Sequence, residues 1–421
     1  MPAYRTDDAA SIEADDRATP GCPHFGPCGG CQFQDLAYPA QLEGKAARLL
    51  SLLNPMPIDL PELRLHPSPP YEYRNRIRLT LSEVDGQLRA GYIRNLSATI
   101  DGAADDSTPS SPASSFLAIT QCPIAAPILW RAAEAFLALL PAHHAALRAT
   151  QHIPDQLELF ANVDESRLQL TLYLRTPAKS LPKEVNAAFA IFCEALRARV
   201  PELTGAGLAL LPRSSTERSR RVEAVRPGPT WGSTGLNYRV AGPDGGVAGT
   251  DYWIPRGAFF QANRYLLPEL LALVTADRSG ALAWDLYSGV GLFSRSLARS
   301  FARVIAVEAA ELAANALSST GLRNLRAVKA STLDFLRTAI IERDRPDFIV
   351  LDPPRTGAGA EVCALLGRIA APTVVYVSCS PQTLPTDLKV LIASGYRVAE
   401  LHLFDLFPQT THIETVAILT R

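Results

Sequence analysis

The stretch ALAWDLYSGVG, residues 281–291, decides the fold class of this chain. Its first part, 281–286, is almost entirely apolar, which is typical of a strand buried on both faces of a parallel sheet. The glycines at positions 289 and 291 permit a tight turn and let a ligand approach the backbone closely. A helical pattern follows over 292–301. The stretch therefore predicts a strand, a glycine-rich turn and a helix, a unit that binds nucleotide cofactors in doubly wound sheets.

An acidic residue lies where such a unit needs one. Glu308 follows the next predicted strand, 304–307, about twenty residues beyond the first, where a carboxylate can accept both hydroxyl groups of a ribose. Position 294 holds serine, whereas the dinucleotide-binding fingerprint has its third glycine there. The pattern therefore favours S-adenosylmethionine over NAD as the cofactor.

The chain beyond Trp253 continues the alternation of strands and helices. Further strands are expected at 348–351 and 374–377, and helices of about ten residues at 311–317, 361–369 and 384–393. Two apolar segments near the end, 398–404 and 413–419, look like a closing hairpin. This alternation predicts an α/β fold with a doubly wound, mainly parallel sheet.

The part that ends near Asp251 predicts a second α/β layer domain. Strands are expected at 76–81 and 88–93 across a turn at Asp85-Gly86, at 156–160 and 168–174 as a pair, and at 205–211. Helices are expected at 39–53, 124–149 and 183–199. We expect the proline-punctuated segment 54–70 to wrap a surface, residues 1–21 to form a disordered tail, and 101–115 to form a mobile insertion.

Composition limits the class of protein. The chain has 421 residues, of which 47% are hydrophobic and 20% charged, as in a globular protein of two or three domains. Its first twenty residues lack the apolar core of a signal peptide, and no stretch approaches the roughly 18 apolar residues of a membrane span. Seven cysteines are too few for a disulfide scaffold, so we expect a cytoplasmic protein with no membrane partner. The net charge of −1 argues against a globally basic nucleic-acid binder but leaves room for a local basic face.

Three cysteines crowd into one glycine-rich loop. The stretch CPHFGPCGGC, residues 22–31, contains Cys22, Cys28 and Cys31, and Cys122 follows far downstream as a candidate fourth thiolate. Four thiolates suit either an iron–sulfur cluster or a zinc ion. The spacing differs from the paired C-x2-C of zinc ribbons. His24 is a further candidate ligand, although an ordinary loop residue is the simpler interpretation.

Another thiol lies at the end of a predicted strand. The stretch VVYVSCSP, residues 374–381, runs from apolar residues into Cys379, at the strand end where open α/β sheets form their ligand crevice. Asp352, in the stretch DPPR of residues 352–355, would enter the crevice from its own strand. Glu414, in DLFPQTTHIE of residues 405–414, supplies a carboxylate at the entrance of a strand, and His412 is a second candidate base.

Six motifs occur together and in one order. They are C-x5-C-x2-C with a distant Cys-Pro, FFQAN (259–263), DLYSGVG (285–291), DPPR (352–355), VSCSPQT (377–383) and FPQTTHIE (407–414). With these motifs the chain resembles the RNA uracil-5-methyltransferases over residues 22–421. The resemblance implies a Rossmann-like methyltransferase domain with a mainly parallel seven-stranded sheet at 251–421. It also implies a preceding α/β central domain at 22–250 that binds RNA and carries an iron–sulfur loop.

The resemblance further implies roles for individual residues. Cys379 would be the nucleophile and Glu414 the base. S-adenosylmethionine would be contacted by Gln261, Tyr287, Gly289, Glu308 and Asp352, and a [4Fe–4S] cluster would be held by Cys22, Cys28, Cys31 and Cys122. The partner would be RNA, with a uridine of 23S rRNA or of tRNA as the target, and the enzyme would be a monomer.

Three positions depart from the residues that the family usually has. Ser380 stands in place of asparagine, Gln409 in place of histidine and Ser288 in place of cysteine. The first two flank catalytic positions and bear on the rate or the choice of target. Only 21 residues precede Cys22, so we expect no N-terminal RNA-binding barrel of the kind that some members carry.

The chemistry of uracil methylation accounts for the same residue types. Uracil C5 is a poor nucleophile, and addition of a thiolate to C6 makes an enolate that can attack a methyl group. A base must then remove the C5 proton so that the thiol can leave. The target base must also leave its stack to reach a buried crevice. Candidate phosphate contacts are Arg74, Arg76, Arg78, Arg89, Arg94, Arg213, Arg218, Arg220, Arg221 and Arg226.

Two other functions stay compatible with these patterns. One is an RNA-binding protein whose methyltransferase domain is impaired by Ser380 and Gln409. The other is an amino-group methyltransferase, in which the Asp352 motif would hold an exocyclic amine and Cys379 would be dispensable. RNA cytosine-5-methyltransferases usually carry Pro-Cys where Pro354-Arg355 stands in this chain.

Overall fold

The computed structural model describes residues 16–56, 59–94, 116–147, 154–176, 181, 183–211, 225–242 and 249–421. The expected insertion at 101–115 lies outside these residues, as do positions 1–15 of the expected tail and the arginines at 213, 218, 220 and 221. Within the described end of that tail, Arg17 forms an ion pair with Asp35 at 3.0 Å.

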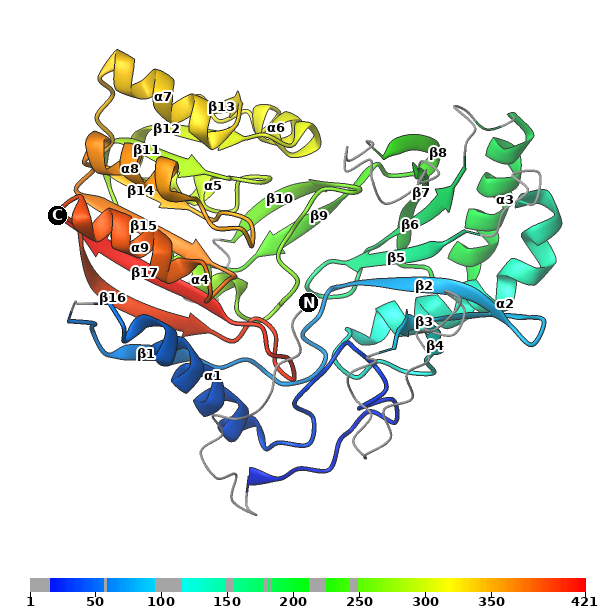
Figure 1. The fold of residues 1–421 in the computed structure, drawn as a ribbon. Coiled ribbons are helices and arrows are strands. Elements are labelled where there is room, and N and C mark those ends of the chain that lie inside the picture. The colour runs from blue at the N-terminus through cyan, green and yellow to red at the C-terminus, as the bar shows by residue number, and fades with distance from the viewer. Residues whose placement is uncertain are drawn as a thin grey trace. The chain divides into compact units, whose positions relative to one another are not determined.

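The chain forms two compact units, which Figure 1 colours along the sequence. The first contains the residues up to Leu36 together with Tyr71–Leu236. The second contains Ala37–Pro70 together with Asn237–Arg421. This grouping differs from the consecutive domains expected from the sequence, because the segment 37–70 packs with the C-terminal part of the chain.

An eight-stranded sheet forms the centre of the second unit. Its strands are β1 (Leu63–His66), β11 (Gly280–Leu286), β12 (Phe301–Glu308), β13 (Leu325–Lys329), β14 (Phe348–Leu351), β15 (Thr373–Ser378), β16 (Arg397–Phe404) and β17 (Glu414–Thr420). They lie in the order β1-β16-β17-β15-β14-β11-β12-β13. Neighbouring strands run parallel except at β17, which is antiparallel to both β15 and β16. The predicted doubly wound, mainly parallel sheet and its closing hairpin are confirmed.

Helices cover both faces of this sheet (Figure 1). One face carries α1 (Tyr38–Leu53), α7 (Thr332–Glu342), α8 (Ala360–Ile369) and α9 (Leu384–Ala393), and the other carries α4 (Leu267–Thr275), α5 (Ser294–Leu297) and α6 (Glu311–Ser318). Alternate strand residues such as Trp284, Tyr376 and Leu401 pack into one core with the first group of helices. Because side chains alternate along a strand, Asp285 points to the opposite face.

The segment 54–70 contributes a strand that the sequence did not predict. Strand β1 pairs in parallel with β16, with Leu63 opposite Leu401 and His66 opposite Phe404. The sheet therefore has eight strands and not the seven predicted. The prolines around β1 suggested a surface wrap, whereas in the structure they flank a short edge strand of four residues, the place where sheets tolerate proline.

The first unit is built on a seven-stranded sheet in the order β4-β3-β2-β5-β6-β7-β8. Its strands are β2 (Arg76–Val84), β3 (Gln87–Ile93), β4 (Phe116–Ala118), β5 (Gln156–Ala161), β6 (Leu168–Arg175), β7 (Leu203–Leu211) and β8 (Arg226–Gly232). Helices α2 (Pro127–Leu147) and α3 (Lys183–Arg199) share one core with the sheet. The predicted pairs β2–β3 and β5–β6 are confirmed.

Strands β9 (Gly235–Val240) and β10 (Thr250–Pro255) form a separate two-stranded sheet.

Several elements were missed or misjudged from the sequence. The helix expected at 292–301 is only the four residues of α5, because Phe301 already begins β12 and lies opposite Gly280 of β11. Helices α4 and α7 and strand β13 were not predicted. Among the described residues, no helix is long and apolar enough to cross a membrane.

Leu49 of α1 tests whether the segment 37–70 belongs to the second unit. Its side chain is fully buried in the core beneath the eight-stranded sheet. Leu49→Ala should lower the free energy of unfolding by about 2–5 kcal/mol, because it leaves a cavity in a packed core. Chemical denaturation measures this change. Ile341→Ala on α7, where the side chain is 81% exposed, is the matched control. Equal losses for both variants would contradict the packing described here.

Candidate active site

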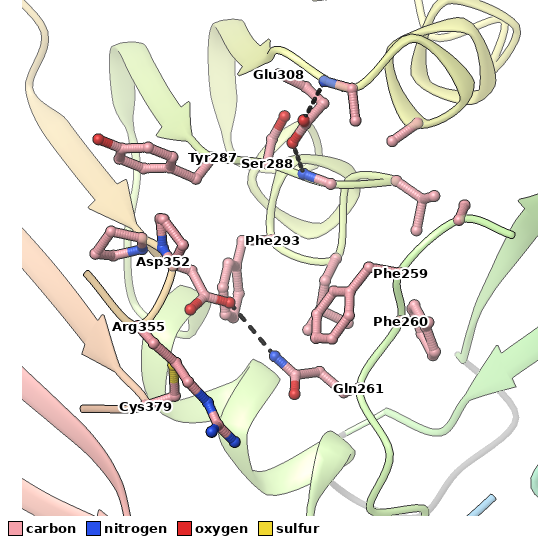
Figure 2. A pocket seen from close by; sticks show the side chains of 18 of the residues that line it. Phe259, Phe260, Gln261, Tyr287, Ser288, Phe293, Glu308, Asp352, Arg355 and Cys379 are labelled. Atoms are coloured by element: carbon pink, nitrogen blue, oxygen red, sulfur yellow. Dashed lines mark hydrogen bonds between the residues drawn. The ribbon is translucent and has the colours of Figure 1, made fainter. Parts of the chain in front are cut away.

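A cavity of about 820 Å³ opens at the carboxyl ends of β11, β12, β14 and β15, the edge at which such sheets bind ligands (Figure 2). Each of these four strands contributes one lining side chain, either from its last residue or from the residue directly after it. In the order of the strands, the lining residues are Tyr287, Glu308, Asp352 and Cys379. Gln261, Gly289 and Glu414 line the same cavity. All seven residues that the sequence assigned to catalysis or cofactor binding are therefore brought together.

The turn after β11 has a backbone that favours glycine. Tyr287, Gly289 and Gly291 have φ angles of 60°, 56° and 89°. A Cβ atom at position 291 would lie 2.6 Å from the Leu317 side chain of α6, whereas one at 289 would meet nothing within 4 Å. Gly291 therefore allows the turn to pack against α6, and Gly289 leaves open space at the cavity wall.

Glu308 holds this turn in place. Its carboxylate accepts hydrogen bonds from the backbone N–H of Gly289 at 2.8 Å and from that of Ala310 at 2.6 Å (Figure 2). A carboxylate has about four acceptor positions, so two hydroxyl groups of a ribose can still be bound. Glu308 thus holds the turn in place and can still accept hydrogen bonds from a sugar.

Asp285 lies buried beneath the turn and explains the serine at position 294. It accepts hydrogen bonds from both the backbone N–H and the hydroxyl group of Ser294. Burial raises the pKa of Asp285 to about 7, although the hydrogen bonds from Ser294 oppose the shift. Where a dinucleotide-binding turn has its third glycine, this chain therefore uses a side chain that stabilises a buried carboxyl group.

Asp352 and Gln261 meet across the cavity. The amide nitrogen of Gln261 donates to Asp352 Oδ2 at 3.3 Å (Figure 2). Burial raises the pKa of Asp352 to about 7, and the nearby carboxyl group of Asp285 contributes to the shift. A ligand amine or sulfonium in this region would be attracted by the ionised form of Asp352.

Cys379 lines the same cavity, one residue after β15. Burial raises the pKa of its thiol to about 11, and the carboxyl groups of Glu414 and Asp352 contribute further, whereas the guanidinium of Arg355 opposes the shift. The ligand-free site therefore holds Cys379 as a neutral thiol at neutral pH. Formation of a thiolate becomes easier when the neighbouring carboxyl groups are neutral and Arg355 is in place.

Glu414 is the first residue of β17, and its side chain is 2% exposed. Burial raises its pKa well above the ordinary value, Asp352 adds to the shift, and Arg355 opposes it. Because β17 runs antiparallel to β15, its first residue reaches the edge of the sheet at which β15 ends. This explains how a residue at the start of a strand joins residues at the ends of others.

Two lining residues, Arg355 and Phe259, had no role in the sequence analysis, and a third, His412, was considered there only as a second candidate base. Arg355 directly follows the Asp352-Pro353-Pro354 turn, and its position in that motif was the available signal. The exposed His412 lies 3.5 Å from Arg355 Nη2 and packs edge to face against Phe407, with ring centroids 5.6 Å apart. Phe259 lines the cavity with 70% of its side chain exposed. Its motif was recognised, but its exposure was not foreseeable from an apolar residue type.

The four expected cluster ligands line a second, smaller cavity of about 130 Å³ in the first unit. Burial raises the pKa of Cys31 to about 12 and that of Cys122 to about 11, and the neighbouring thiols of Cys22 and Cys28 contribute to both shifts. Among the described residues, no three His, Cys, Asp or Glu side chains are arranged to hold a metal ion as they stand. The four thiols therefore line one cavity but, as they stand, are not arranged to bind a single metal ion.

The described arginines are not all available to a phosphate. Arg78 is bound to Glu158 at 2.6 Å and to the hydroxyl group of Tyr173 at 2.8 Å. Arg76 stacks on the ring of Phe160, 4.0 Å from its centroid. Their assignment as phosphate contacts is not supported by this geometry. Arg74 and Arg78 both line the cysteine cavity, and Arg89 and Arg94 are exposed.

The fold and the site together define a class of protein. A doubly wound sheet with one antiparallel strand beside β15, and with a glycine turn closed by an acidic residue after the next strand, is the Rossmann-like fold of S-adenosylmethionine-dependent methyltransferases. The fold of this chain is similar to that of Pyrococcus abyssi tRNA (uracil-54, C5)-methyltransferase in complex with S-adenosyl-L-homocysteine. The TM-score is 0.66 at 23% identity, covering 93% of this chain and 86% of that chain.

Sequence comparisons identify the family. The tRNA (uracil-5-)-methyltransferase family model matches residues 249–421. The 23S rRNA (uracil(1939)-C(5))-methyltransferase RlmD of Halomonas elongata is 30% identical over 420 residues, which cover 96% of this chain and 77% of that protein. An uncharacterized RNA methyltransferase of Thermotoga maritima is 27% identical over 424 residues, covering 97% and 86%. The chain belongs to the family of S-adenosylmethionine-dependent RNA uracil-5-methyltransferases.

The pKa of Asp352 predicts how stability changes with pH. Its folded value of about 7 exceeds the ordinary value of 3.8, so the folded protein keeps a proton that the unfolded chain loses. The stabilising effect of this carboxyl group is complete below about pH 4 and is lost as the pH rises through about 7. Asp352→Asn cannot ionise, and it should match the wild type near pH 4 and be more stable at pH 8 by on the order of 2–4 kcal/mol. Urea unfolding of the ligand-free proteins measures the difference, and a difference that does not vary with pH would contradict the raised pKa.

Proposed function

We propose that this protein transfers a methyl group from S-adenosylmethionine to C5 of a uridine in RNA through a covalent bond between Cys379 and C6 of the base. The observation that carries the proposal is that Cys379 and Glu414 share one cavity with the glycine turn and Glu308. One cavity thus offers a nucleophile and a base to a bound uridine, and a binding site to the nucleoside part of a methyl donor. Neither an RNA-binding module nor an amine methyltransferase requires a thiol at this point.

The cofactor contacts are assigned to the wall formed by the turn. Glu308 would accept the ribose hydroxyl groups, and Gly289 leaves room for the sugar to approach the backbone. Tyr287, Gln261 and Asp352 would surround the rest of the molecule, with the Asp352 carboxylate near the positive sulfonium. S-adenosylmethionine supplies the methyl group.

Cys379 begins the reaction by adding to the base. Its thiolate attacks C6 of uracil, the C5–C6 double bond opens, and the electron pair is held at C5 as an enolate. C5 then bonds to the methyl group, whose bond to the donor sulfur breaks to leave a neutral thioether. The ligand-free thiol has a pKa of about 11, so its proton must be lost when the substrates bind. Arg355 favours the thiolate, and the closure of the cavity over an RNA base would strengthen this effect by excluding water.

Glu414 completes the reaction. Once methylated, C5 carries both a methyl group and a hydrogen, and the Glu414 carboxylate removes that hydrogen as a proton. The C–H electron pair restores the C5–C6 double bond, and the bond from C6 to Cys379 breaks to return the thiolate. The pKa of Glu414 is raised by burial, which makes its ionised form a stronger base than an exposed glutamate.

The target is assigned to 23S rRNA. The RlmD protein of Halomonas elongata, named for a uridine of 23S rRNA, is similar over 96% of this chain. A tRNA remains the second candidate, because the matching family model is named for tRNA. Mass spectrometry of nucleosides and mapped fragments from a strain that lacks the gene would separate the two, since only the true target loses its 5-methyluridine.

Substitutions of Cys379 and Glu414 should block different steps of the reaction. Cys379→Ala removes the nucleophile, so neither methylation nor a covalent RNA conjugate should form. Glu414→Gln keeps the nucleophile and the methyl transfer but loses the base, so it should accumulate a conjugate that carries the new methyl group. Denaturing gel electrophoresis with radiolabelled methyl donor detects this species. An active Cys379→Ala variant would support amine methylation instead, and a wild type that forms no conjugate even with 5-fluorouridine RNA would support an impaired enzyme.

We further propose that Cys22, Cys28, Cys31 and Cys122 hold a [4Fe–4S] cluster. The raised pKa values of Cys28, Cys31 and Cys122 mean that burial opposes their thiolates in the absence of a positive group, which iron would supply. A zinc ion needs four sulfurs about 2.3 Å from one point, whereas thiols spread round a cavity suit the larger cluster. The cluster would tie the loop 22–31 to Cys122 and would have a structural role, because the methylation steps transfer no electrons to it.

Metal content tests the cluster independently of methylation. Anaerobically purified protein should be brown and contain iron and acid-labile sulfide, and it should lose iron on oxidation in air. Cys122→Ala should lower the iron content sharply, because one of four thiolates is lost. Cys193→Ala is the matched control, since Cys193 is buried in the core of the same unit. Stoichiometric zinc without iron would contradict the proposal.

A further inference from the structure

The loop between β16 and β17, residues 405–413, carries several cavity residues. Phe407 and His412 lie in it, and Glu414 follows directly. The loop contains a tight turn in which Gln409 has a φ angle of +67°. The Phe407 carbonyl accepts a hydrogen bond from the Thr410 hydroxyl group at 2.7 Å. The position of the proposed base therefore depends on how this turn is held.

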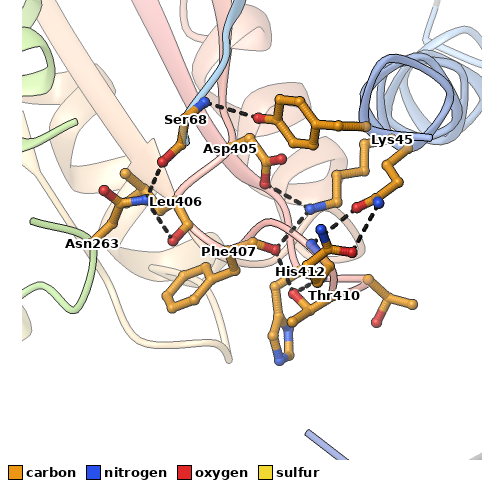
Figure 3. A network of polar contacts seen from close by, with 12 residues as sticks. Lys45, Ser68, Asn263, Asp405, Leu406, Phe407, Thr410 and His412 are labelled. Carbon is orange, nitrogen blue, oxygen red and sulfur yellow. Dashed lines mark hydrogen bonds and ion pairs between the residues drawn. The ribbon is translucent and has the colours of Figure 1, made fainter. Parts of the chain in front are cut away.

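One face of helix α1 contacts the loop (Figure 3). The residues concerned are Gln41, Lys45 and Arg48, which are four and three positions apart and so project from the same side of a helix. Lys45 and Arg48 donate to the loop backbone, to the carbonyl of Phe407 at 2.9 Å and to that of Thr411 at 3.1 Å. Figure 3 shows the rings of Phe407 and His412 extending from the loop on the side away from α1.

Lys45 also forms a fully buried ion pair with the loop. Its ammonium group lies 2.7 Å from Asp405 Oδ1, and the two side chains are 2% and 0% exposed. Burial lowers the pKa of Lys45, and the Asp405 carboxylate opposes that shift. Because a buried charge without its partner is strongly destabilising, this pair fixes where α1 and the loop meet.

Gln41 and Gln409 form a reciprocal pair. The Gln41 amide donates to Gln409 Oε1 at 2.9 Å, and Gln41 Oε1 accepts from the backbone N–H of Gln409 at 3.0 Å. Both side chains are buried. The pair therefore fixes the residue of the loop whose backbone is left-handed, a conformation that a glutamine adopts only when its surroundings hold it there.

The loop is also held from the opposite direction. Asn263 donates to the Leu406 carbonyl at 3.1 Å and to the Ser68 hydroxyl group at 2.8 Å (Figure 3). Ser68 is itself bound through its backbone N–H to the hydroxyl group of Tyr38, at the start of α1. The backbone of the loop is thus fixed at 406, 407, 409 and 411 by groups outside it.

We propose that the Gln41, Lys45 and Arg48 face of α1 is a positioning device that sets the Glu414 carboxylate against the C5 proton of the methylated intermediate. This inference rests on the proposed function. Gln41, Lys45 and Arg48 do not line the cavity, so they act through the loop and not on the substrate. Gln409, where the family usually has histidine, is accommodated here by its partner Gln41.

Gln41→Met tests the device, because methionine has a similar length but neither donates nor accepts the two hydrogen bonds. The variant should add Cys379 to RNA and transfer the methyl group, but elimination should slow by roughly ten- to hundredfold, since small displacements of a catalytic group have such effects. The methylated conjugate should then accumulate during turnover. The probe is total RNA from a strain that lacks the gene, with S-adenosylmethionine, followed by rapid quenching and a denaturing gel.

Two comparisons separate positioning from general stability. Val362→Ala, on the buried face of α8, should lower stability by removing apolar contacts but breaks no hydrogen bond to the loop, so the variant should release its product at the wild-type rate. Gln409→Met should slow elimination as Gln41→Met does, and the double variant should be no slower than either single one, because both substitutions break the same pair.

Each outcome decides the proposal. Wild-type elimination in Gln41→Met, or equal slowing in Val362→Ala, would overturn the positioning role and leave the proposed reaction intact. A failure of Glu414→Gln to accumulate any conjugate would overturn the proposed reaction, and the positioning role with it. Slow elimination in both glutamine variants, with normal elimination in Val362→Ala, would support the positioning role.

Discussion

The alignment of strand ends at one edge of the eight-stranded sheet is the constraint on which the rest of this structure depends. Parallel strands β11, β12, β14 and β15 end there, and each contributes one side chain to the lining of a common cavity. Strand β17 runs the other way, so its first residue, Glu414, reaches the same edge as the last residues of its neighbours. A parallel strand in the place of β17 would bring its final residue to the cavity instead. The antiparallel insertion is therefore what pairs the proposed base with Cys379.

Charge balance in a buried space follows from that alignment. Asp285, Asp352 and Glu414 all have raised pKa values because burial disfavours their charged forms, and Arg355 opposes the shifts of Glu414 and Cys379. Such a site favours neutral groups until a positive cofactor and an RNA base enter it. The sulfonium of S-adenosylmethionine would favour the Asp352 carboxylate, which opposes ionisation of Cys379, and the positive charge of the sulfonium would offset that opposition. Arg355 would favour the thiolate. Binding of the positive cofactor and ionisation of the nucleophile would then be linked through their opposite charges.

The sequence could predict the site because several site residues directly follow a recognisable apolar run. Apolar runs that stop at Cys379, Asp352 and Glu308 mark strand ends, and strand ends meet at one edge of a sheet.

The sequence could not predict β1 or the role of α1, because both depend on partners more than 300 positions away, as in the contact of Gln41 with Gln409. The short strand β1 carries a half-exposed pattern with no apolar run. The helix expected at 292–301 failed because pairing with β11 determines where β12 begins. Nor did the residue type of Arg76 and Arg78 reveal that protein groups already bind them.

The central claim is that Cys379 forms a covalent bond to the base while Glu414 stands ready to remove the C5 proton. The most direct measurement replaces that proton with fluorine, which a base cannot abstract. Wild-type protein is incubated with S-adenosylmethionine and RNA containing 5-fluorouridine, digested with nuclease and protease, and mapped by mass spectrometry. The account predicts one modified peptide, the one containing Cys379, carrying a methylated fluorouridine nucleotide. A nucleotide on another cysteine, or 5-methylation of natural RNA by a protein that forms no such peptide, would contradict it.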